Sequence, residues 1–186
     1  MADHVDDPRH RYSYELRPDA ALDRSIRELA LRLELDGLIA SGAATAPRFQ
    51  PHITLLRADH ADESAVRQLA LDMSARPGLE LAEVGTFGHG RILWIAPADD
   101  RALRTARSRL VAALGDEHVD PLALARDPWV PHVTVAYAID EPNRAAAKQL
   151  LGEHVPLRGH WTVAQCWDLD VRPTTCVANA SIRHGH

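Results

Sequence analysis

The sequence predicts an α+β fold with two pseudo-symmetric lobes, each an antiparallel sheet with two helices, around a central cleft. Three observations predict it: the order of expected strands and helices occurs twice, the two copies keep a nearly constant offset, and each copy carries the same His-x-Thr motif. A chain of 186 residues is long enough for two small lobes that share one core.

The first helix of each half is expected within residues 16–38 and 95–115, because apolar side chains recur there at helical spacing. The apolar faces consist of Leu22, Ile26, Leu29 and Leu33 in the first segment and Leu103, Ala106, Leu110 and Ala113 in the second. Each helix follows a short strand that ends in proline, Pro18 in the first half and Pro97 in the second. The motif strands come next in both halves.

A second helix is expected after each motif strand. Asp62 precedes the first of these helices, and Asp140 precedes the other, in which Pro142 suits the first turn. A hairpin follows in each half, over residues 79–98 with its turn at Gly88-His89-Gly90, and over residues 159–182 with its turn near Arg172-Pro173. We expect some of these strands to be exchanged between the halves.

The domain boundaries follow from this repeat. We expect a flexible tail at 1–10 and a single bilobal domain at 11–183, with an internal repeat of about 11–94 and 95–183. No apolar run approaches the roughly 18 residues that cross a bilayer, and the first ten residues lack the basic and apolar regions of a signal peptide. We therefore expect a cytoplasmic monomer without a membrane contact.

Charge and cysteine content narrow the function classes. The formal net charge is −5, which disfavours a broad surface for binding long nucleic acids but leaves room for a small phosphate pocket. Cys166 and Cys176 match neither a CxxC motif nor a zinc pair, so we expect reduced core thiols. The histidines near both termini are expected to be solvated.

Two short segments carry the candidate chemistry: "PHITLL" at 51–56 and "PHVTVAY" at 131–137, which are separated by nearly the same offset as Pro18 and Pro97. Alternate residues of a strand face opposite sides. The expected apolar faces are Phe49, Pro51, Ile53 and Leu55, and Trp129, Pro131, Val133, Val135 and Tyr137; the opposite faces are Arg48, Gln50, His52 and Thr54, and Val130, His132, Thr134 and Ala136. Each half thus presents one histidine and one threonine on the same face.

Paired histidines suit acid-base catalysis on a phosphate. One neutral imidazole can take a proton from the attacking oxygen while a protonated one gives a proton to the leaving oxygen. The hydroxyls of Thr54 and Thr134 can donate to the phosphate oxygens, and no metal or cofactor is required. A single His-x-Thr is more often structural, but packing does not call for the motif twice. We therefore expect His52, Thr54, His132 and Thr134 to be catalytic.

The paired motifs resemble those of the two-histidine (2H) phosphoesterase superfamily and, within it, the 2′-5′ RNA ligase-like proteins. Further likeness lies in "LRPDAALDRSIREL", "FGHGRILWIAP" and "CWDLDVR", so that the resemblance covers about residues 11–183. It implies a bilobal fold with a central cleft and metal-independent hydrolysis of 2′,3′-cyclic phosphates, on RNA 3′ ends or small nucleotides, to 2′-phosphates. In some members it also implies reversible 2′-5′ RNA joining.

Substrate contacts are less clearly marked. Some relatives place an arginine shortly after the second motif, where this chain has Tyr137. Arg48 and Arg91 are substitutes for it. Phe87 is a candidate for stacking on a base, as are Trp94, Trp129 and Trp167, although core packing is favoured for all four. Tyr137 completes this set of substrate-binding candidates. Of the remaining residues, His89 suits a loop, and His60 and His118 have no motif context.

Three other functions compete with this one. The chain could be a catalytically idle module that binds nucleotides or RNA ends, or a phosphodiesterase for another small nucleotide. The intact pair of motifs argues against the idle module. A histidine metal hydrolase is disfavoured, because no third ligand keeps a regular spacing with His52 and His132. No obligate protein partner is evident.

Overall fold

The computed structural model describes residues 10–40, 42, 44, 46, 49–74, 78–125, 129–170 and 174–179. Its strands are β1 (Tyr12–Pro18), β2 (Ile53–Ala58), β3 (Leu79–Phe87), β4 (Ile92–Pro97), β5 (Val133–Ala136), β6 (Leu157–Gly159), β7 (Trp161–Asp168) and β8 (Thr174–Asn179). Its helices are α1 (Ala20–Leu35), α2 (Glu63–Ser74), α3 (Arg101–Leu114), α4 (Pro121–Ala125) and α5 (Arg144–His154), with short 3₁₀ turns η1 (Asp116–His118) and η2 (Glu141–Asn143). The expected α+β class is confirmed.

Helices α1 and α3 bury the faces that the sequence predicts, with one exception. The helix expected directly after Asp140 begins later, because Pro142 lies in the 3₁₀ turn η2 and α5 starts at Arg144. The Asp19 side chain accepts from the backbone N–H groups of the first turn of α1, as an N-cap residue does. All four expected apolar residues of α1 are buried. In α3, however, Ala113 is exposed and Leu114 is buried instead. Both positions lie near the face set by Leu110, and the larger apolar side chain takes the core position.

The strands form one antiparallel sheet in the order β6-β3-β4-β5-β2-β1-β7-β8. Strand β3 belongs to the first half of the sequence but pairs with β6 of the second. Strand β7 belongs to the second half but pairs with β1 of the first. The expected exchange of strands between the halves is therefore confirmed.

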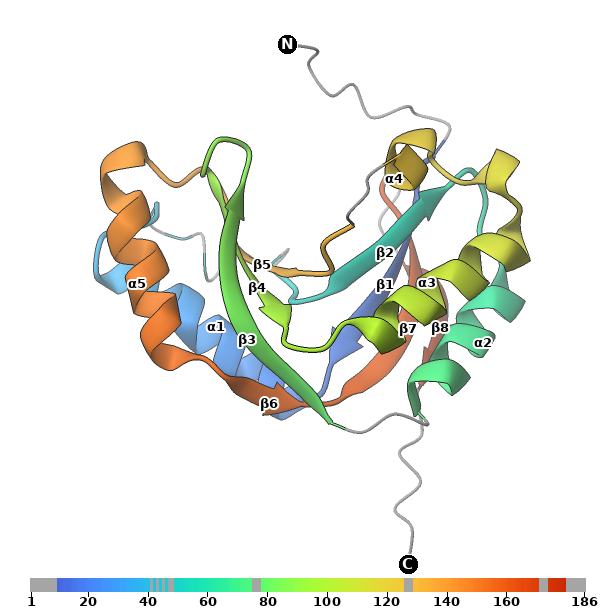
Figure 1. Cartoon of the computed structure of the whole chain (residues 1–186), viewed down its shortest axis with the longest axis horizontal. Coiled ribbons are helices and arrows are strands. Elements are labelled where there is room, and N and C mark those ends of the chain that lie inside the picture. Colours follow the sequence, from blue (N-terminus) through green and yellow to red (C-terminus); the bar gives the residue numbers. More distant parts are fainter. Residues whose placement is uncertain are drawn as a thin grey trace, which may run out of the picture.

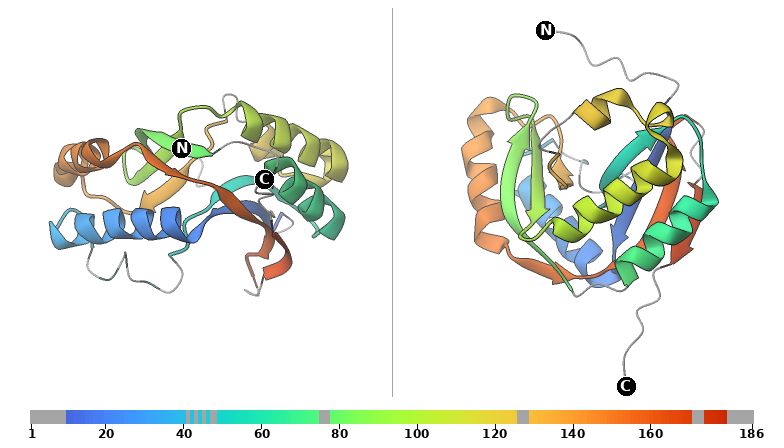
Figure 2. Two further views of the ribbon diagram at one scale, coloured as in Figure 1. Left: turned by 90° about the horizontal axis from the view of Figure 1, so that it is seen from below. Right: turned by 45° about the vertical axis from the view of Figure 1, so that its right-hand side comes forward.

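Two pairs of helices flank the curled sheet (Figures 1 and 2). Helices α1 and α5 pack against each other and against β3, β4, β5 and β6, whereas α2 and α3 pack against each other and against β2, β7 and β8. Each lobe thus combines four strands with two main helices. Within the described part of the chain, none of the helices is long and apolar enough to cross a membrane.

A row of buried residues crosses the middle of the sheet and joins the two lobes. Leu16 of β1 lies opposite Ile53 of β2, Ile53 opposite Val133 of β5, and Val133 opposite Ile95 of β4. These four side chains are at most 1% exposed. The Ile53–Val133 pair lies where the two halves meet, so it marks the pseudo-twofold axis.

Several expectations fall wholly or partly outside the described residues. The expected tail is one of them, except for its last residue, His10. His10 is buried, so the expectation that it is solvated was wrong. The turn at Arg172-Pro173 and the side chain of Cys176 are others. Cys166 is buried in β7, and its backbone lies opposite that of Cys176 in β8. Reduced thiols stay a prediction.

Candidate active site

The two His-x-Thr motifs lie side by side on the central strands. Because β2 and β5 are antiparallel and Ile53 pairs with Val133, the next positions on the opposite face place His52 across from Thr134 and Thr54 across from His132. Opposed residues in such a pair have Cβ atoms about 5 Å apart. All four side chains are partly exposed, unlike the buried row beneath them. The sheet register therefore brings the four predicted catalytic residues together.

Both imidazoles are held in the same way. The Nδ1–H of His52 donates to the carbonyl of Gln50 at 2.7 Å, and the Nδ1–H of His132 donates to the carbonyl of Val130 at 2.8 Å. A carbonyl oxygen can only accept, so Nδ1 carries a proton in both rings. The Nε2 atom of each ring is consequently the one that can exchange a proton.

A buried carboxylate lies beside the first motif. Glu15 of β1 pairs with Thr54, and its Oε1 atom lies 3.7 Å from Nε2 of His52. The Glu15 side chain is 8% exposed, and its Oε2 atom accepts a hydrogen bond from Nε2 of Gln165 at 2.9 Å. This carboxylate therefore lies close to the ring nitrogen of His52 that can exchange a proton.

Aromatic rings occupy the equivalent place beside the second motif. Trp94 pairs with Thr134, as Glu15 pairs with Thr54. Phe87 meets the His132 ring edge-on, with centroids 4.8 Å apart, and the Trp94 ring lies 6.2 Å from His132. The Trp94 indole covers Gly85, where an added Cβ would lie only 2.0 Å from the ring. Glycine is therefore required at position 85 for this arrangement.

The pairs Glu15–Gln165 and Trp94–Gly85 were not recognised in the sequence as parts of the site. Both are cross-strand neighbours, and the two pairs occupy corresponding places in the repeat. The available signal for this part of the site was Glu15, a charged residue in the buried middle of a strand. The two lobes thus differ in chemistry where they match in geometry.

The four predicted substrate-binding residues have different outcomes. Phe87 lies against His132, as described above. Arg48 lies outside the described residues. Arg91 is exposed beyond the β3–β4 turn, and Ile139 donates to its backbone carbonyl. Its substrate contact stays a prediction.

Tyr137 does not lie on the apolar face that strand alternation predicts, because it is 60% exposed. Strand β5 ends at Ala136, and Ala138 has a positive φ of 55°, so the alternation stops before Tyr137. The assignment to the apolar face was therefore wrong. An exposed ring remains available for a substrate contact.

Each motif strand is preceded by an aromatic residue that an arginine covers. Arg27 lies over the Phe49 ring at 5.6 Å, and Arg107 lies over the Trp129 ring at 5.1 Å. Arg107 also donates to the carbonyl of Leu55 at 3.0 Å, and its burial lowers its pKa. The two arginines occupy corresponding positions in the repeat, as do the two aromatics. These pairs anchor the start of the motif strands, and Trp129 packs against the core as expected.

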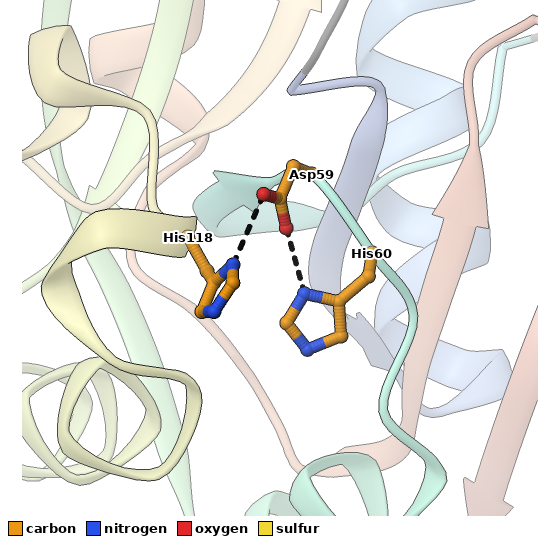
Figure 3. A group of neighbouring side chains, drawn as sticks. All are labelled: Asp59, His60 and His118. Atoms are coloured by element: carbon orange, nitrogen blue, oxygen red, sulfur yellow. Dashed lines mark hydrogen bonds and ion pairs between the residues drawn. The ribbon is translucent and has the colours of Figure 1, made fainter.

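Possible metal ligands lie elsewhere. Among the described residues, a group of three ligand side chains that could hold an ion consists of Asp59, His60 and His118, beyond the far end of β2 from His52 (Figure 3). A surface cavity lies between α2 and α3, beside the ion pair of Asp72 and Arg109, and includes none of the motif residues.

Solved structures with a similar fold include three that cover 91% of this chain. Apo E. coli LigT has a TM-score of 0.58 at 16% identity, with 96% of its own chain covered. E. coli LigT complexed with 3′-AMP has a TM-score of 0.53 at 17% identity, with 94% covered. A structure described as a phosphoesterase has a TM-score of 0.53 at 16% identity, with 97% covered.

A search of curated protein sequences found no significant match. A family model of the 2′-5′ RNA ligase superfamily, in contrast, matches residues 18–170, which include both motifs and strands β2 to β7. This match agrees with the 2H phosphoesterase fold, and it supports a phosphoesterase or ligase-type enzyme. The chain belongs to the 2′-5′ RNA ligase superfamily.

Proposed function

We propose that this protein is a metal-independent phosphodiesterase that hydrolyses 2′,3′-cyclic phosphates of RNA 3′ ends or small nucleotides to 2′-phosphates. The observation that carries the proposal is the duplicated motif geometry. Two imidazoles on neighbouring strands each use Nδ1 to bind a backbone carbonyl, which leaves two Nε2 atoms for proton transfer. An in-line displacement at phosphorus needs two such groups.

The reaction balances with one water molecule. One Nε2 takes a proton from water as the water oxygen attacks phosphorus. The bond between phosphorus and the 3′-oxygen breaks, and the Nε2–H of the other imidazole protonates that oxygen. The product is a 2′-phosphate with a free 3′-hydroxyl. Proton exchange with solvent then restores both rings.

The different surroundings of the two histidines support a proposal for which of them is the acid and which is the base. The Glu15 carboxylate lies 3.7 Å from Nε2 of His52, and a negative charge there suits a ring that carries a proton on Nε2. We therefore assign His52 as the general acid that protonates the 3′-oxygen. His132, whose ring meets those of Phe87 and Trp94, then takes the role of the general base. This assignment breaks the equivalence that the repeated motif implies.

The two threonines bind the phosphate. Thr54 lies across from His132, and Thr134 lies across from His52, so their hydroxyls flank the position between the rings. From there they donate to the non-bridging oxygens, whose charge changes in the transition state. Removal of one such donor from an active site commonly costs roughly 10²- to 10³-fold in kcat.

Two observations favour a small substrate over a long RNA. The net charge of −5 does not suit a long RNA backbone, which requires a run of phosphate contacts. The similar E. coli LigT has been solved with 3′-AMP, a single nucleotide. Reversible 2′-5′ RNA joining, which the family resemblance implies for some members, would use the same two imidazoles.

The test is incubation with 2′,3′-cyclic mononucleotides and with oligonucleotides that end in a cyclic phosphate, followed by chromatography that resolves 2′- from 3′-phosphates. We expect a 2′-phosphate, at a rate that chelators do not change. His52→Ala and His132→Ala should each lower turnover by roughly 10²- to 10⁴-fold. His154→Ala, an exposed histidine on α5, is the matched control and should leave turnover unchanged.

The possible outcomes separate the alternatives. A 3′-phosphate product would refute the assigned regiochemistry. Binding of cyclic nucleotides without turnover would indicate the idle module instead. Inertness toward every cyclic phosphate would point to another phosphodiester. Loss of activity in chelator, restored by a divalent ion, would support a metal hydrolase.

A further inference from the structure

The structure joins three metal-ligand side chains that are far apart in the sequence. Asp59 and His60 follow the last residue of β2, whereas His118 ends η1 after α3. The Asp59 carboxylate accepts a hydrogen bond from Nδ1–H of His60 at 2.7 Å on one oxygen, and from Nδ1–H of His118 at 3.0 Å on the other (Figure 3). The two rings stand almost perpendicular, with centroids 4.9 Å apart.

The backbone holds these side chains in place. The N–H of Asp59 donates to the carbonyl of His118 at 3.0 Å, and the N–H of Asp120 donates to the carbonyl of Arg57 at 3.0 Å. An isolated bridge joins Ala58 to Val119 between these two bonds. The two segments are thus paired like short antiparallel strands, so their side chains meet in a fixed arrangement.

A buried tyrosine fixes the His60 segment as well. The hydroxyl of Tyr14, whose side chain is fully buried, donates to the carbonyl of His60 at 3.3 Å and accepts from the N–H of Asp62 at 2.8 Å. Such support from the surrounding structure is what a preformed metal site needs, since its ligands must be held within a few tenths of an ångström.

We propose that Asp59, His60 and His118 form a zinc site. Their ligand atoms all lie within 4.8 Å of one another. Zinc bonds of about 2.0–2.2 Å to nitrogen and oxygen place neighbouring tetrahedral ligands about 3.4 Å apart. The hydrogen-bonded pairs would therefore separate slightly on binding, and ligand atoms that lie farther apart would move closer together. Two imidazoles and one carboxylate suit Zn²⁺, whereas Ca²⁺ and Mg²⁺ prefer oxygen ligands. Water completes the tetrahedron.

A second carboxylate supports the orientation of His118. Glu117 places Oε1 3.9 Å from Nε2 of His118, the ring nitrogen that does not contact Asp59. When Nδ1 binds the ion, the imidazole proton must lie on Nε2, the nitrogen near Glu117. An outer carboxylate commonly orients a zinc-bound histidine in this way.

The site lies away from the proposed reaction. His52 immediately precedes β2 and Asp59 immediately follows it, so the whole length of β2 separates them, which corresponds to roughly 20 Å. The ion would fasten the end of β2 to η1 and would not touch the substrate. We therefore expect zinc to stabilise the fold and to leave turnover unchanged.

Calorimetric titration of the metal-free protein with ZnCl₂ tests this proposal. We expect one equivalent to bind, and the thermal unfolding midpoint to rise with zinc. Added Co²⁺ should give the visible absorption of a tetrahedral ion without any variant being needed. His60→Ala, His118→Ala and Asp59→Asn should each weaken binding at least roughly tenfold, because changes to ligands and to the groups that orient them have effects of this size or larger.

Two controls exclude binding by other histidines. His154→Ala removes an exposed histidine outside the cluster, and the double variant His184→Ala/His186→Ala removes those at the C-terminus. Both should bind zinc like the wild type. Each of three outcomes would overturn the proposal. The terminal variant could lose zinc binding, all three cluster variants could bind zinc like the wild type, or the wild type could fail to bind at a large excess of zinc.

Discussion

Glu15 gives the sharpest test of the assigned roles, because its two carboxylate oxygens do different things. One oxygen accepts from the buried amide of Gln165 at 2.9 Å, and the other lies 3.7 Å from Nε2 of His52. Glu15→Gln removes the charge but keeps an oxygen that can accept from Gln165. Glu15→Ala removes both the charge and the acceptor. The pair of variants therefore separates electrostatics from packing.

The two variants should differ in stability. In Glu15→Gln, a hydrogen bond to a charged group becomes a neutral one, which costs about 1 kcal/mol. In Glu15→Ala, the buried amide of Gln165 loses its acceptor, and an unsatisfied buried group costs roughly 1–3 kcal/mol. We therefore expect urea denaturation to give a lower free energy of unfolding for Glu15→Ala than for Glu15→Gln.

The two variants should agree in catalysis, because both remove the charge beside His52. A carboxylate beside an imidazolium stabilises its positive charge, and neither variant retains that carboxylate. If His52 is the general acid, the alkaline limb of the profile of kcat/KM against pH moves to lower pH in both variants. The assay is hydrolysis of a 2′,3′-cyclic mononucleotide across the pH range, with the exposed Glu83→Gln as control.

A shift of the acidic limb to lower pH would instead make His52 the base and His132 the acid. A profile identical to that of the wild type and of Glu83→Gln would show that Glu15 does not act on His52, and the assignment would be refuted. Because the two limbs belong to a coupled pair, the comparison concerns which limb moves and not the values of either.

The remaining predictions concern the neighbouring ring, a loop anchor and the pH profile. Gly85→Ala should displace the Trp94 indole, lower the free energy of unfolding by roughly 1–3 kcal/mol and reduce turnover. In the control Gly152→Ala, the added Cβ meets nothing within 4 Å, so stability and turnover should not fall. Glu34 accepts from the N–H groups of Gly42 and Ala44, and these bonds lower its pKa below 4.5. Glu34→Ala should therefore lower the urea midpoint above pH 4.5, with a deficit that disappears as the pH falls through the lowered pKa. Turnover of the wild type should follow a bell-shaped pH profile, which EDTA leaves unchanged and a divalent-ion requirement would contradict.

Local patterns predicted most of the fold, because each depends only on neighbouring residues. The helical periodicity of α1 and the turn at Gly88-His89-Gly90 are examples, and both are confirmed. The constant offset of the repeat then indicated which elements correspond. It could also predict that some strands are exchanged, but not which partner each strand has.

Contacts across strands required the three-dimensional register. Glu15 and His52 lie on opposite sides of α1 in the sequence, and only the pairing of β1 with β2 places them together. His60 and His118 are separated by four intervening elements and had no motif context, yet the bridge beside β2 joins them. Tyr137 shows the opposite error, since a local rule was extended one residue past the end of its strand.

The repeat explains both the likeness of the two histidines and the need for their difference. An attacking water and a leaving sugar oxygen are chemically distinct, so two rings in identical surroundings could not favour one direction of proton transfer. The halves share the His-x-Thr positions and differ at the equivalent positions Glu15 and Trp94. Their cross-strand neighbours differ as well. Gln165 donates a hydrogen bond to the Glu15 carboxylate, whereas Gly85 leaves room for the Trp94 indole. The side chains that break the symmetry are therefore the ones that we expect to set the direction of the reaction.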